Sequence, residues 1–407
     1  MTTNFPTSVD AFTNPTSNDT LDNPPHDQQH ADINDAMEAV QTKIGADGSA
    51  VSSSLDYRVA ALEQSSGRRN LLYNGAMQVA QRGTSTTGIT SSGYYTADRF
   101  RLSLGTQGTW THTVENDGPD GYPKSFKMLC TAADASPAAG DFVAFQQYLE
   151  GYDVQGIKKG TPSALQLTLS FWVKSNVTGT YIAELRDDDN NRQVSASYTV
   201  SASGTWERKT ITFPADTTGT FNNDNSNSLS LILWQGAGST YSSGTLNTSW
   251  ASSVSANRAA GQTNLASAVN NYWQVTGVQL EIGNKATPFE HRSYGEELAL
   301  CQRYYERVNY GNNNVVLGMG LFYQTTLLVC ELTWKTLKRA DPTITLPPVG
   351  DSEVLINGAV RAVSSVSVSP SKPTSATVNV TTTTSHTAGY PGIYRMDGSS
   401  YSIEAEL

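Results

Sequence analysis

The feature that most restricts the fold is a two-residue hydrophobic period that recurs between residues 68 and 309. Polar turns separate the segments that carry this period, and no helical pattern alternates with them. A period of two belongs to β-strands with one face in a core. The apolar positions of the clearest segments are Leu165, Leu167, Leu169, Phe171 and Val173, then Ile211 and Phe213, then Leu229, Leu231 and Leu233. This succession predicts a mainly β fold built as a sandwich of two antiparallel sheets.

The end of this region changes its period. Val278, Leu280 and Ile282 alternate with polar residues, which predicts one more buried strand. Beyond a turn and a proline, apolar residues recur at helical spacing, at Leu298, Cys301, Tyr305 and Val308. The sequence therefore predicts a strand, a loop and a short amphipathic helix at the end of the sandwich.

Two segments of this region carry a family resemblance. GVQLEIGNKATPFE (residues 277–290), followed by ELALCQRYYE (297–306), resembles the end of a β-sandwich module common in bacteriophage tail fibres. NLLYNGAMQVAQRG (70–83) resembles the opening of the same module, and HADINDAMEAVQTKIG (30–45) is similar to the segment that precedes many phage fibre domains. The resemblance covers roughly residues 30–310. It implies a jelly roll of the carbohydrate-binding-module type in a virion fibre that is assembled in the host cytoplasm.

The first 66 residues predict an arm and a stalk. Residues 1–30 are rich in proline and polar residues and should be extended. Residues 31–66 carry an interrupted heptad pattern, which predicts a helical trimerisation stalk. Its seam positions are Ile33, Met37, Val40, Ile44, Val51, Leu55 and Leu62. The alternative is two short helices packed on a globular domain. The resemblance implies a homotrimer whose arm attaches to the phage tail or an adaptor protein.

The sandwich is predicted over residues 67–309, and residues 310–407 predict a smaller C-terminal β domain. Low charge and many β-branched residues suit a distal knob formed between chains, although a single chain could also close it. The Thr-rich segment 375–385 is typical of a strand at a sheet edge.

Charge and composition exclude several classes of partner. The net charge of −10, without a basic stripe, argues against nucleic acid. No apolar run approaches a membrane span, and the N-terminal residues lack the basic start and apolar core of a signal peptide. The three cysteines, Cys130, Cys301 and Cys330, are odd in number and predict buried free thiols.

Aromatic residues supply the candidates for glycan binding. Trp234, Tyr241 and Trp250 bracket a long polar loop, and loops on a rigid sandwich are where recognition is commonly located. Trp110 is a further candidate as an exposed aromatic residue. A structural role for these residues is the alternative, because the sequence of the loop resembles a pattern shared by the family.

The acidic run Asp187, Asp188 and Asp189 lies where a hairpin turn is expected. A Ca²⁺ site is one interpretation, since carboxylate oxygens are the ligands that Ca²⁺ prefers. A solvated turn is the favoured one, because the ligand spacing of an EF-hand and its closing glutamate are missing. No other cofactor is expected.

Catalytic patterns are weak. The five histidines are scattered without a local partner pattern for a triad. The expectation is therefore a protein that is not an enzyme and that adheres to host cell-surface polysaccharide. Two alternatives remain: a fibre connector or a head or tail decoration protein without receptor binding of its own, and, less favoured, a glycan depolymerase.

Overall fold

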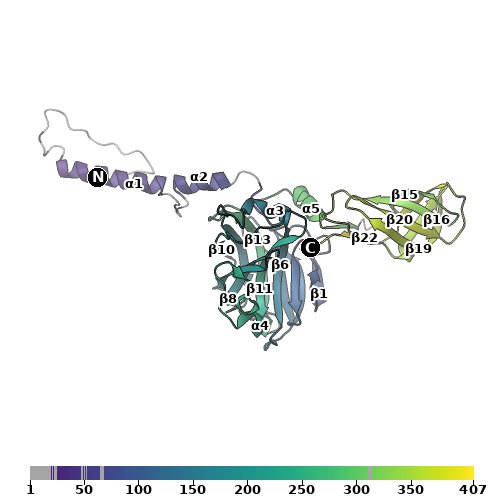
Figure 1. The fold of residues 1–407 in the computed structure, drawn as a ribbon, viewed down its shortest axis with the longest axis horizontal. Helices are drawn as coiled ribbons and strands as arrows, with labels where there is room; N and C mark the ends of the chain where they lie inside the picture. Colours follow the sequence, from purple (N-terminus) through teal and green to yellow (C-terminus); the bar gives the residue numbers. More distant parts are fainter. Residues whose placement is uncertain are drawn as a thin grey trace. The chain divides into compact units, whose positions relative to one another are not determined.

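The computed structural model describes residues 20, 22, 25–46, 49, 51, 53–64, 68–309 and 314–407. The chain divides into two compact units, residues 1–69 and residues 70–407 (Figure 1). Most of the expected N-terminal arm lies outside the described residues.

The first unit contains two helices, α1 (His26–Ile44) and α2 (Leu55–Gln64). α1 begins within the segment expected to be extended, directly after Pro25, which occupies its N-cap. It ends at Gly45, whose φ of 84° is a conformation that glycine adopts readily. The seam side chains of Ile33, Met37, Ile44, Val51 and Leu55 are 47–54% exposed.

Val40 is half-buried, and the side chain of Leu62 lies outside the described residues. The structure describes a single chain, so trimerisation stays a prediction. A trimer would cover the exposed apolar side chains of the seam.

The second unit begins with a sandwich of two antiparallel sheets. One sheet has six strands in the order β1 (Ser85–Ile89), β4 (Thr109–Glu115), β5 (Ser125–Ala132), β13 (Tyr272–Ile282), β7 (Leu167–Ser175) and β10 (Glu207–Phe213). The other has seven in the order β12 (Ala251–Ser252), β9 (Arg192–Val200), β8 (Gly179–Asp187), β11 (Asn227–Ala237), β6 (Phe142–Glu150), β3 (Arg101–Gly105) and β2 (Gly93–Tyr94). The mainly β sandwich expected from the sequence is thus present.

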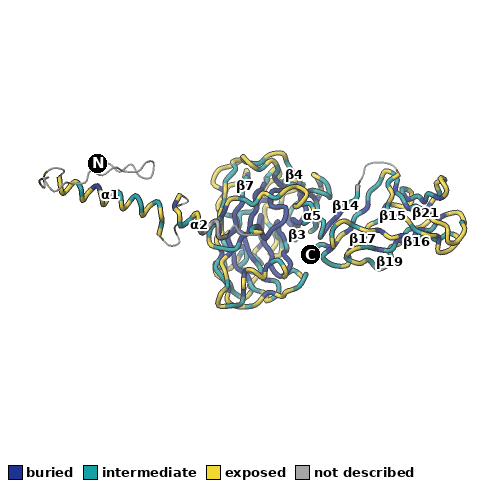
Figure 2. The backbone as a smooth tube through the Cα atoms, turned by 90° about the horizontal axis from the view of Figure 1, so that it is seen from above, coloured by how far each residue is buried: buried dark blue, intermediate teal, exposed yellow. Residues whose placement is uncertain are grey.

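Short helical segments join some of these strands. They are α3 (Gly151–Val154), η1 (Gln155–Ile157), α4 (Ser239–Ser242), η2 (Ser255–Asn257) and η3 (Leu265–Ser267). Buried residues concentrate in the strands of the sandwich (Figure 2). The predicted inward positions are buried, except Ile282, which is half-buried at the end of β13, and Leu165, which precedes β7 and is exposed. Stacked rings occupy the centre of the core, with Phe145 between Phe100 and Phe126 at centroid distances of 4.8 and 4.1 Å.

The opening and closing motifs of the sandwich meet in space. The Leu71 amide donates to the Leu280 carbonyl, and the Val278 amide donates to the Gly75 carbonyl, both at 2.9 Å. A Cβ on Gly75 would lie 2.1 Å from the Val278 carbonyl oxygen, so this approach requires glycine. The side chain of Asn70 completes the junction by donating to the Val278 carbonyl. These contacts explain physically why two motifs so far apart in sequence belong to one module.

The closing helix is shorter than predicted. α5 spans Tyr294–Gln302, with Ser293 as its N-cap. Tyr305 and Val308, expected on the helical stripe, instead lie in strand β14 (Tyr305–Asn309). β14 joins β22 (Ser400–Glu404) and β17 (Thr343–Thr345) in a three-stranded sheet. Pairing with a strand from the far end of the chain, which no local period reveals, ends the helix.

Residues 315–396 form a closed six-stranded barrel within one chain. Its strands, in order, are β15 (Val315–Phe322), β16 (Leu327–Thr333), β20 (Ser375–Thr382), β19 (Ala359–Ser371), β18 (Ser352–Ile356) and β21 (Pro391–Met396), and the short η4 (Val349–Asp351) precedes β18. Its core includes Phe322, Leu332 and Tyr394. The Thr-rich strand β20 pairs on both sides, so its prediction as an edge strand is wrong.

The outer face of β15 carries an exposed apolar row. Val316, Met319, Leu321 and the following Tyr323 are 55–74% exposed. Solvent-facing apolar rows of this kind mark contact surfaces more often than isolated residues do.

The three cysteines are buried and free, as predicted. Burial raises the pKa of the Cys330 thiol to about 12, so this group is protonated and unreactive at neutral pH. Among the described residues, no helix is long and apolar enough to cross a membrane.

Candidate functional site

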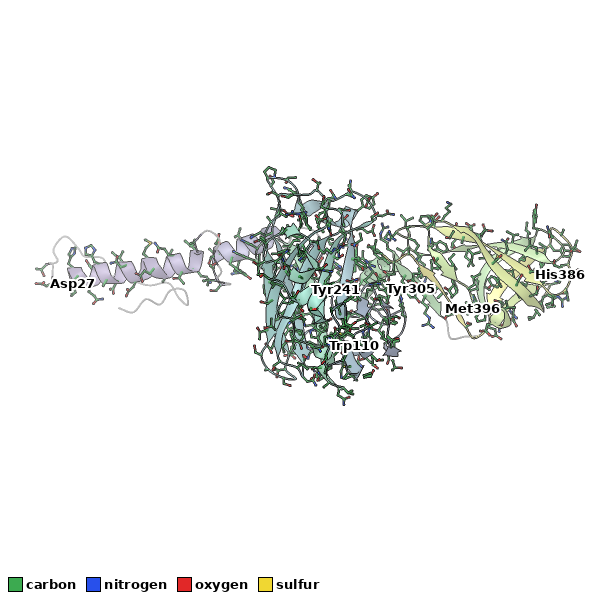
Figure 3. The ribbon with its side chains drawn as sticks, turned by 60° about the horizontal axis from the view of Figure 1, so that its bottom comes forward. Asp27, Trp110, Tyr241, Tyr305, His386 and Met396 are labelled. Carbon is green, nitrogen blue, oxygen red and sulfur yellow. The ribbon has the colours of Figure 1, made fainter. Side chains whose placement is uncertain are left out.

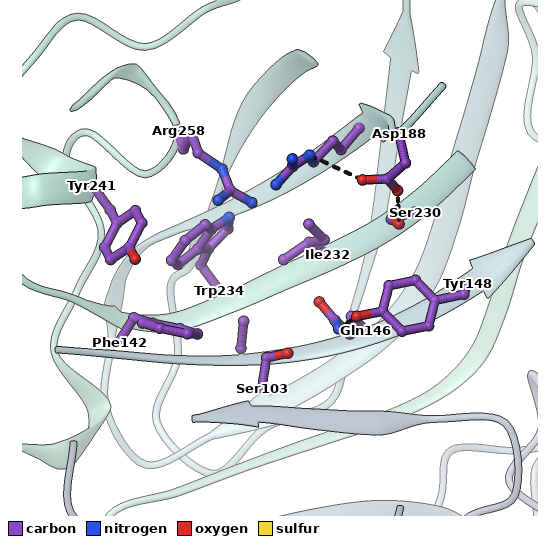
Figure 4. Close-up of a pocket in the computed structure, with 12 residues that line it drawn as sticks. Ser103, Phe142, Gln146, Tyr148, Asp188, Ser230, Ile232, Trp234, Tyr241 and Arg258 are labelled. Atoms are coloured by element: carbon purple, nitrogen blue, oxygen red, sulfur yellow. Dashed lines mark hydrogen bonds and ion pairs between the residues drawn. The ribbon is translucent and has the colours of Figure 1, made fainter. Parts of the chain in front are cut away.

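A groove of about 190 Å³ lies on the outer face of the seven-stranded sheet (Figure 4). The period of two creates this face: Leu229, Leu231 and Leu233 of β11 enter the core, so Ser230 and Ile232 point the opposite way. The loop after β11 lies over the same face through Tyr241 and Arg258. The lining residues are Ser103, Phe142, Ala144, Gln146, Tyr148, Arg186, Asp188, Ser230, Ile232, Trp234, Tyr241 and Arg258.

One end of the groove is aromatic. The rings of Phe142 and Tyr241 lie 5.2 Å apart between centroids, and those of Trp234 and Tyr241 lie 5.6 Å apart. Phe142 and Tyr241 are half-buried, whereas Trp234 is only 1% exposed. Trp234 therefore forms the floor, and the other two rings offer the surface that a ligand can contact.

A buried ion pair fixes this floor. Trp234 Nε1 donates to Glu184 Oε2 at 2.9 Å. Arg258 donates to both oxygens of the same carboxylate, at 2.9 and 3.1 Å, and its guanidinium lies 5.0 Å from the Trp234 ring centroid. Two-point contacts between arginine and a carboxylate hold both groups in one geometry. The aromatic end is therefore preorganised.

The other end is polar. Asp188 accepts hydrogen bonds from Ser230 and Asn227 and pairs with Arg186 at 3.0 Å. Burial raises the pKa of Asp188 above its usual value, although the hydrogen bond from Ser230 opposes this effect. Across the floor, Gln146 donates to the Tyr148 hydroxyl. The groove thus presents amide, hydroxyl, carboxylate and guanidinium groups beside its aromatic rings (Figure 4).

This combination suits a neutral, hydroxyl-rich ligand. Small-molecule sites join apolar and aromatic surface to a few placed polar groups. The two arginines in the groove face Glu184 and Asp188, so their charges are largely compensated inside the protein. Such a surface favours neither a highly negative nor a highly positive ligand.

The structure brings together two of the four predicted aromatic residues, Trp234 and Tyr241. Trp250 lies elsewhere: its Nε1 donates to the Pro214 carbonyl, and the Lys159 amine is 5.2 Å from its ring. Trp110 has no exposed surface and donates to the Gln107 carbonyl within the core, so its prediction as an exposed residue is wrong. It lies on β4, where His112 follows at the next inward position.

Sequence reasoning missed Phe142, Gln146, Tyr148 and Arg258. A local signal existed for the first three, because in FVAFQQYLE they share a face with Ala144 at a period of two. Arg258 lies in an irregular segment after η2 and has no comparable signal.

The carboxylates of the acidic run bind other residues of the same chain. Asp187 accepts a hydrogen bond from the amine of Lys159, which also pairs with Asp216 at 3.1 Å. Asp189 accepts from the backbone and the side chain of Asn222. Among the described residues, no group of three or more His, Cys, Asp or Glu side chains is arranged to hold a metal ion. Asp187 ends β8 and has no exposed surface, so the solvated-turn interpretation is wrong for this residue, while Asp188 and Asp189 are half-buried.

Neither a protein-family model nor a curated protein sequence matches the chain. Solved structures with limited similarity include the enzymatically active domain of tailspike protein 4 from bacteriophage CBA120, which is 17% identical with a TM-score of 0.28. That match covers 52% of this chain and 21% of the tailspike chain, so this chain spans about a fifth of its length.

Two carbohydrate-binding modules are also similar. The family 11 module from Clostridium thermocellum, solved with a mixed-linked β-1,3-1,4 tetrasaccharide, is 12% identical over 50% of this chain and 98% of its own, with a TM-score of 0.26. The CBM22-1 xylan-binding domain from Paenibacillus barcinonensis is 11% identical over 54% of this chain and 100% of its own, with a TM-score of 0.25. Similarity at this level assigns no function to this chain.

Proposed function

We propose that this protein binds carbohydrate through the groove on the seven-stranded sheet. The observation that carries the proposal is the preorganised aromatic end, Phe142 and Tyr241 above Trp234, beside a row of hydrogen-bonding side chains. Ring faces contact the apolar faces of sugars, and the polar row offers partners for hydroxyl groups. The groove is small, about 190 Å³, so each site should bind weakly and gain strength from several copies.

The proposed setting is a homotrimeric phage tail fibre that adheres to host cell-surface glycans. Two features support this setting: the resemblance of residues 30–45, 70–83 and 277–306 to fibre modules, and the exposed heptad seam of α1. The arm would attach to the tail or an adaptor protein, and the protein would be assembled in the host cytoplasm and carried on the virion.

The proposal is binding without cleavage. Hydrolysis of a glycosidic bond normally needs two carboxyl groups free to act on the substrate. Glu184 is fully buried and is bound by Arg258 and Trp234 of the groove lining, and Asp188 in the groove is bound by Arg186, Ser230 and Asn227. We expect no release of reducing ends from a polysaccharide that the protein binds.

Removing either of the two accessible rings is expected to weaken glycan binding. Tyr241→Ala and Phe142→Ala should each weaken binding about tenfold, because a well-placed aromatic contact is worth roughly 1–1.5 kcal/mol. Titration calorimetry of the full chain against a panel of bacterial surface polysaccharides measures the effect. Tyr152→Ala is the matched control, because Tyr152 is exposed on α3, outside the groove.

The exposed row on β15 favours a second candidate, a connector that contacts another protein through the barrel. Host-cell binding that survives both groove substitutions but is lost in Met319→Ser and Tyr323→Ser would contradict the groove proposal and favour this one. Circular dichroism of each variant shows whether the sheets remain folded.

Substitution on the seam is expected to separate the chains. Met37→Asp places a charge at a predicted inter-helix position, so the trimer should dissociate to monomers at micromolar concentration. Ala31→Asp adds the same charge to the same helix but off the seam, and should leave the mass unchanged. Light scattering measures both variants, and a trimeric Met37→Asp variant would show that the seam is not an interface.

A further inference from the structure

His26 and His30 form an exposed pair in the first turns of α1, where Figure 3 marks the neighbouring Asp27. Their spacing of four residues puts both rings on one face of the helix. The two Nε2 atoms are 3.1 Å apart, and the ring centroids are 4.5 Å apart. The groove and its proposed function do not use this pair.

One interpretation is a hydrogen bond between two neutral rings. In an exposed position such a bond competes with water and adds little stability. The other interpretation is a pair of ligands to one metal ion. Two nitrogens at about 2.0–2.1 Å from an ion, at an angle of about 90–110°, are separated by roughly 2.9–3.4 Å. The observed 3.1 Å falls within this range, so the rings need little rearrangement to bind an ion.

We propose that His26 and His30 bind a divalent late transition-metal ion of the class of Ni²⁺, Cu²⁺ or Zn²⁺. Neutral imidazole suits these ions, whereas Ca²⁺ and Mg²⁺ require oxygen ligands. Within one chain the pair supplies two ligands, and water completes the coordination. The remaining histidines of the chain, His112, His291 and His386, are far apart in sequence and offer no second pair of this spacing.

The pair also continues the predicted seam. From His26 the steps to His30, Ile33, Met37, Val40 and Ile44 are four, three, four, three and four residues. His26 and His30 thus occupy the next two seam positions toward the N-terminus. In the proposed trimer, and only if that proposal holds, three such pairs would meet at the three-fold axis of the helical bundle. Polar rings in a seam are costly unless they have partners, and a shared ion would provide one.

The position at a helix N-terminus works against a cation. The helix dipole there repels positive charge by about 0.3–1 kcal/mol. Asp27, which lies in the same turn and is exposed, supplies a compensating negative charge. Two imidazole ligands outweigh a penalty of this size, so the net expectation is binding in the range that titration can measure.

The test is titration calorimetry of the full, chelator-treated chain with NiCl₂, together with electron paramagnetic resonance of the Cu²⁺-loaded protein. We expect saturable binding and hyperfine coupling to at least two nitrogens. His26→Ala and His30→Ala should each weaken binding at least tenfold, while His291→Ala should not. The double variant His30→Ala with Ala31→His keeps the composition but breaks the spacing, and should bind as weakly as the single variants.

Tight binding by that spacing variant, or no saturable binding by the native chain, would overturn the proposal. Light scattering of the metal-free sample separates this outcome from failure of the proposed trimer. A trimer without metal binding refutes the site alone. A monomer that binds one ion through two nitrogens supports the site and refutes the proposed trimer, and with it the placement of the site on a three-fold axis.

Discussion

Replacing Glu406 by glutamine is expected to lower the free energy of unfolding of residues 70–407 by about 3–5 kcal/mol. The Glu406 carboxylate pairs with Arg99, a fully buried residue, and with Arg82 at 3.2 Å. Glutamine keeps the size of the side chain and removes the charge. Arg99 would then remain buried beside the Tyr304 ring, 3.4 Å from its centroid, without its anionic partner.

The position of this carboxylate makes the effect large. Glu406 follows β22 and carries the C-terminal segment onto the sandwich, where Arg339 donates to the carbonyls of Ala405 and Glu406 at 2.9 and 3.0 Å. Arg303 and Glu150 form a further ion pair close by, at 2.7 Å. Loss of one charge therefore weakens a shared network as well as a single contact.

Urea denaturation followed by tryptophan fluorescence measures the change. The matched control is Asp341→Asn, which removes the exposed pair with Lys372, 3.6 Å apart. Exposed pairs contribute little, so the control should differ from the native protein by less than about 1 kcal/mol. Equal effects of the two substitutions would mean that the Arg99–Glu406 pair does not stabilise the junction.

Local patterns predicted the sandwich because several of its long strands carry their own period of two. The inward residues of β7, β10 and β11 were identified in this way, and they are buried. The end of α5, the closure of the barrel and the pairing of Glu406 with Arg99 were not predictable. Each depends on residues that are distant in sequence, 307 positions apart for the Arg99–Glu406 contact.

The groove was predicted only in part, for a similar reason. Trp234 and Tyr241 are close in sequence, so one loop identified both. Phe142 and Glu184 reach the same place from β6 and β8, which pair with opposite sides of β11. Trp110 was predicted to be exposed, but it occupies an inward position of β4 and therefore lies in the core. The strand period decides which face of the sheet an aromatic residue occupies, but not its burial: Trp234 lies on the outer face and is still only 1% exposed.

Acidification from pH 7 to pH 4 is expected to change the stability of two variants in opposite directions. Burial lowers the pKa of His112 from 6.5 to about 3. Its ring lies against the edges of Tyr95 and Phe126, and its Nε2 has no hydrogen-bond partner among the described residues. Below pH 6.5 the His112 ring is protonated in the unfolded chain but stays neutral in the folded chain down to about pH 3. His112 therefore lowers the free energy of unfolding by about 3 kcal/mol between pH 7 and pH 4.

Asp98 acts in the opposite sense. Burial raises its pKa from 3.8 to about 6, although Arg82 and the hydrogen bonds from Gln81 oppose this effect. Between these values the folded chain holds a proton that the unfolded chain does not. Asp98 therefore adds about 2 kcal/mol of stability between pH 7 and pH 4. In the native protein this gain offsets most of the loss caused by His112.

Single substitutions remove that offset. Relative to the native protein, His112→Leu should gain about 3 kcal/mol between pH 7 and pH 4, and Asp98→Asn should lose about 2 kcal/mol. Denaturation curves at both pH values measure each difference, whatever the substitution costs at pH 7. The double variant should follow the pH dependence of the native protein to within about 1 kcal/mol. Shifts of the same sign in the two single variants would show that one of these groups titrates differently in the folded chain, and the double variant would then depart from the native curve.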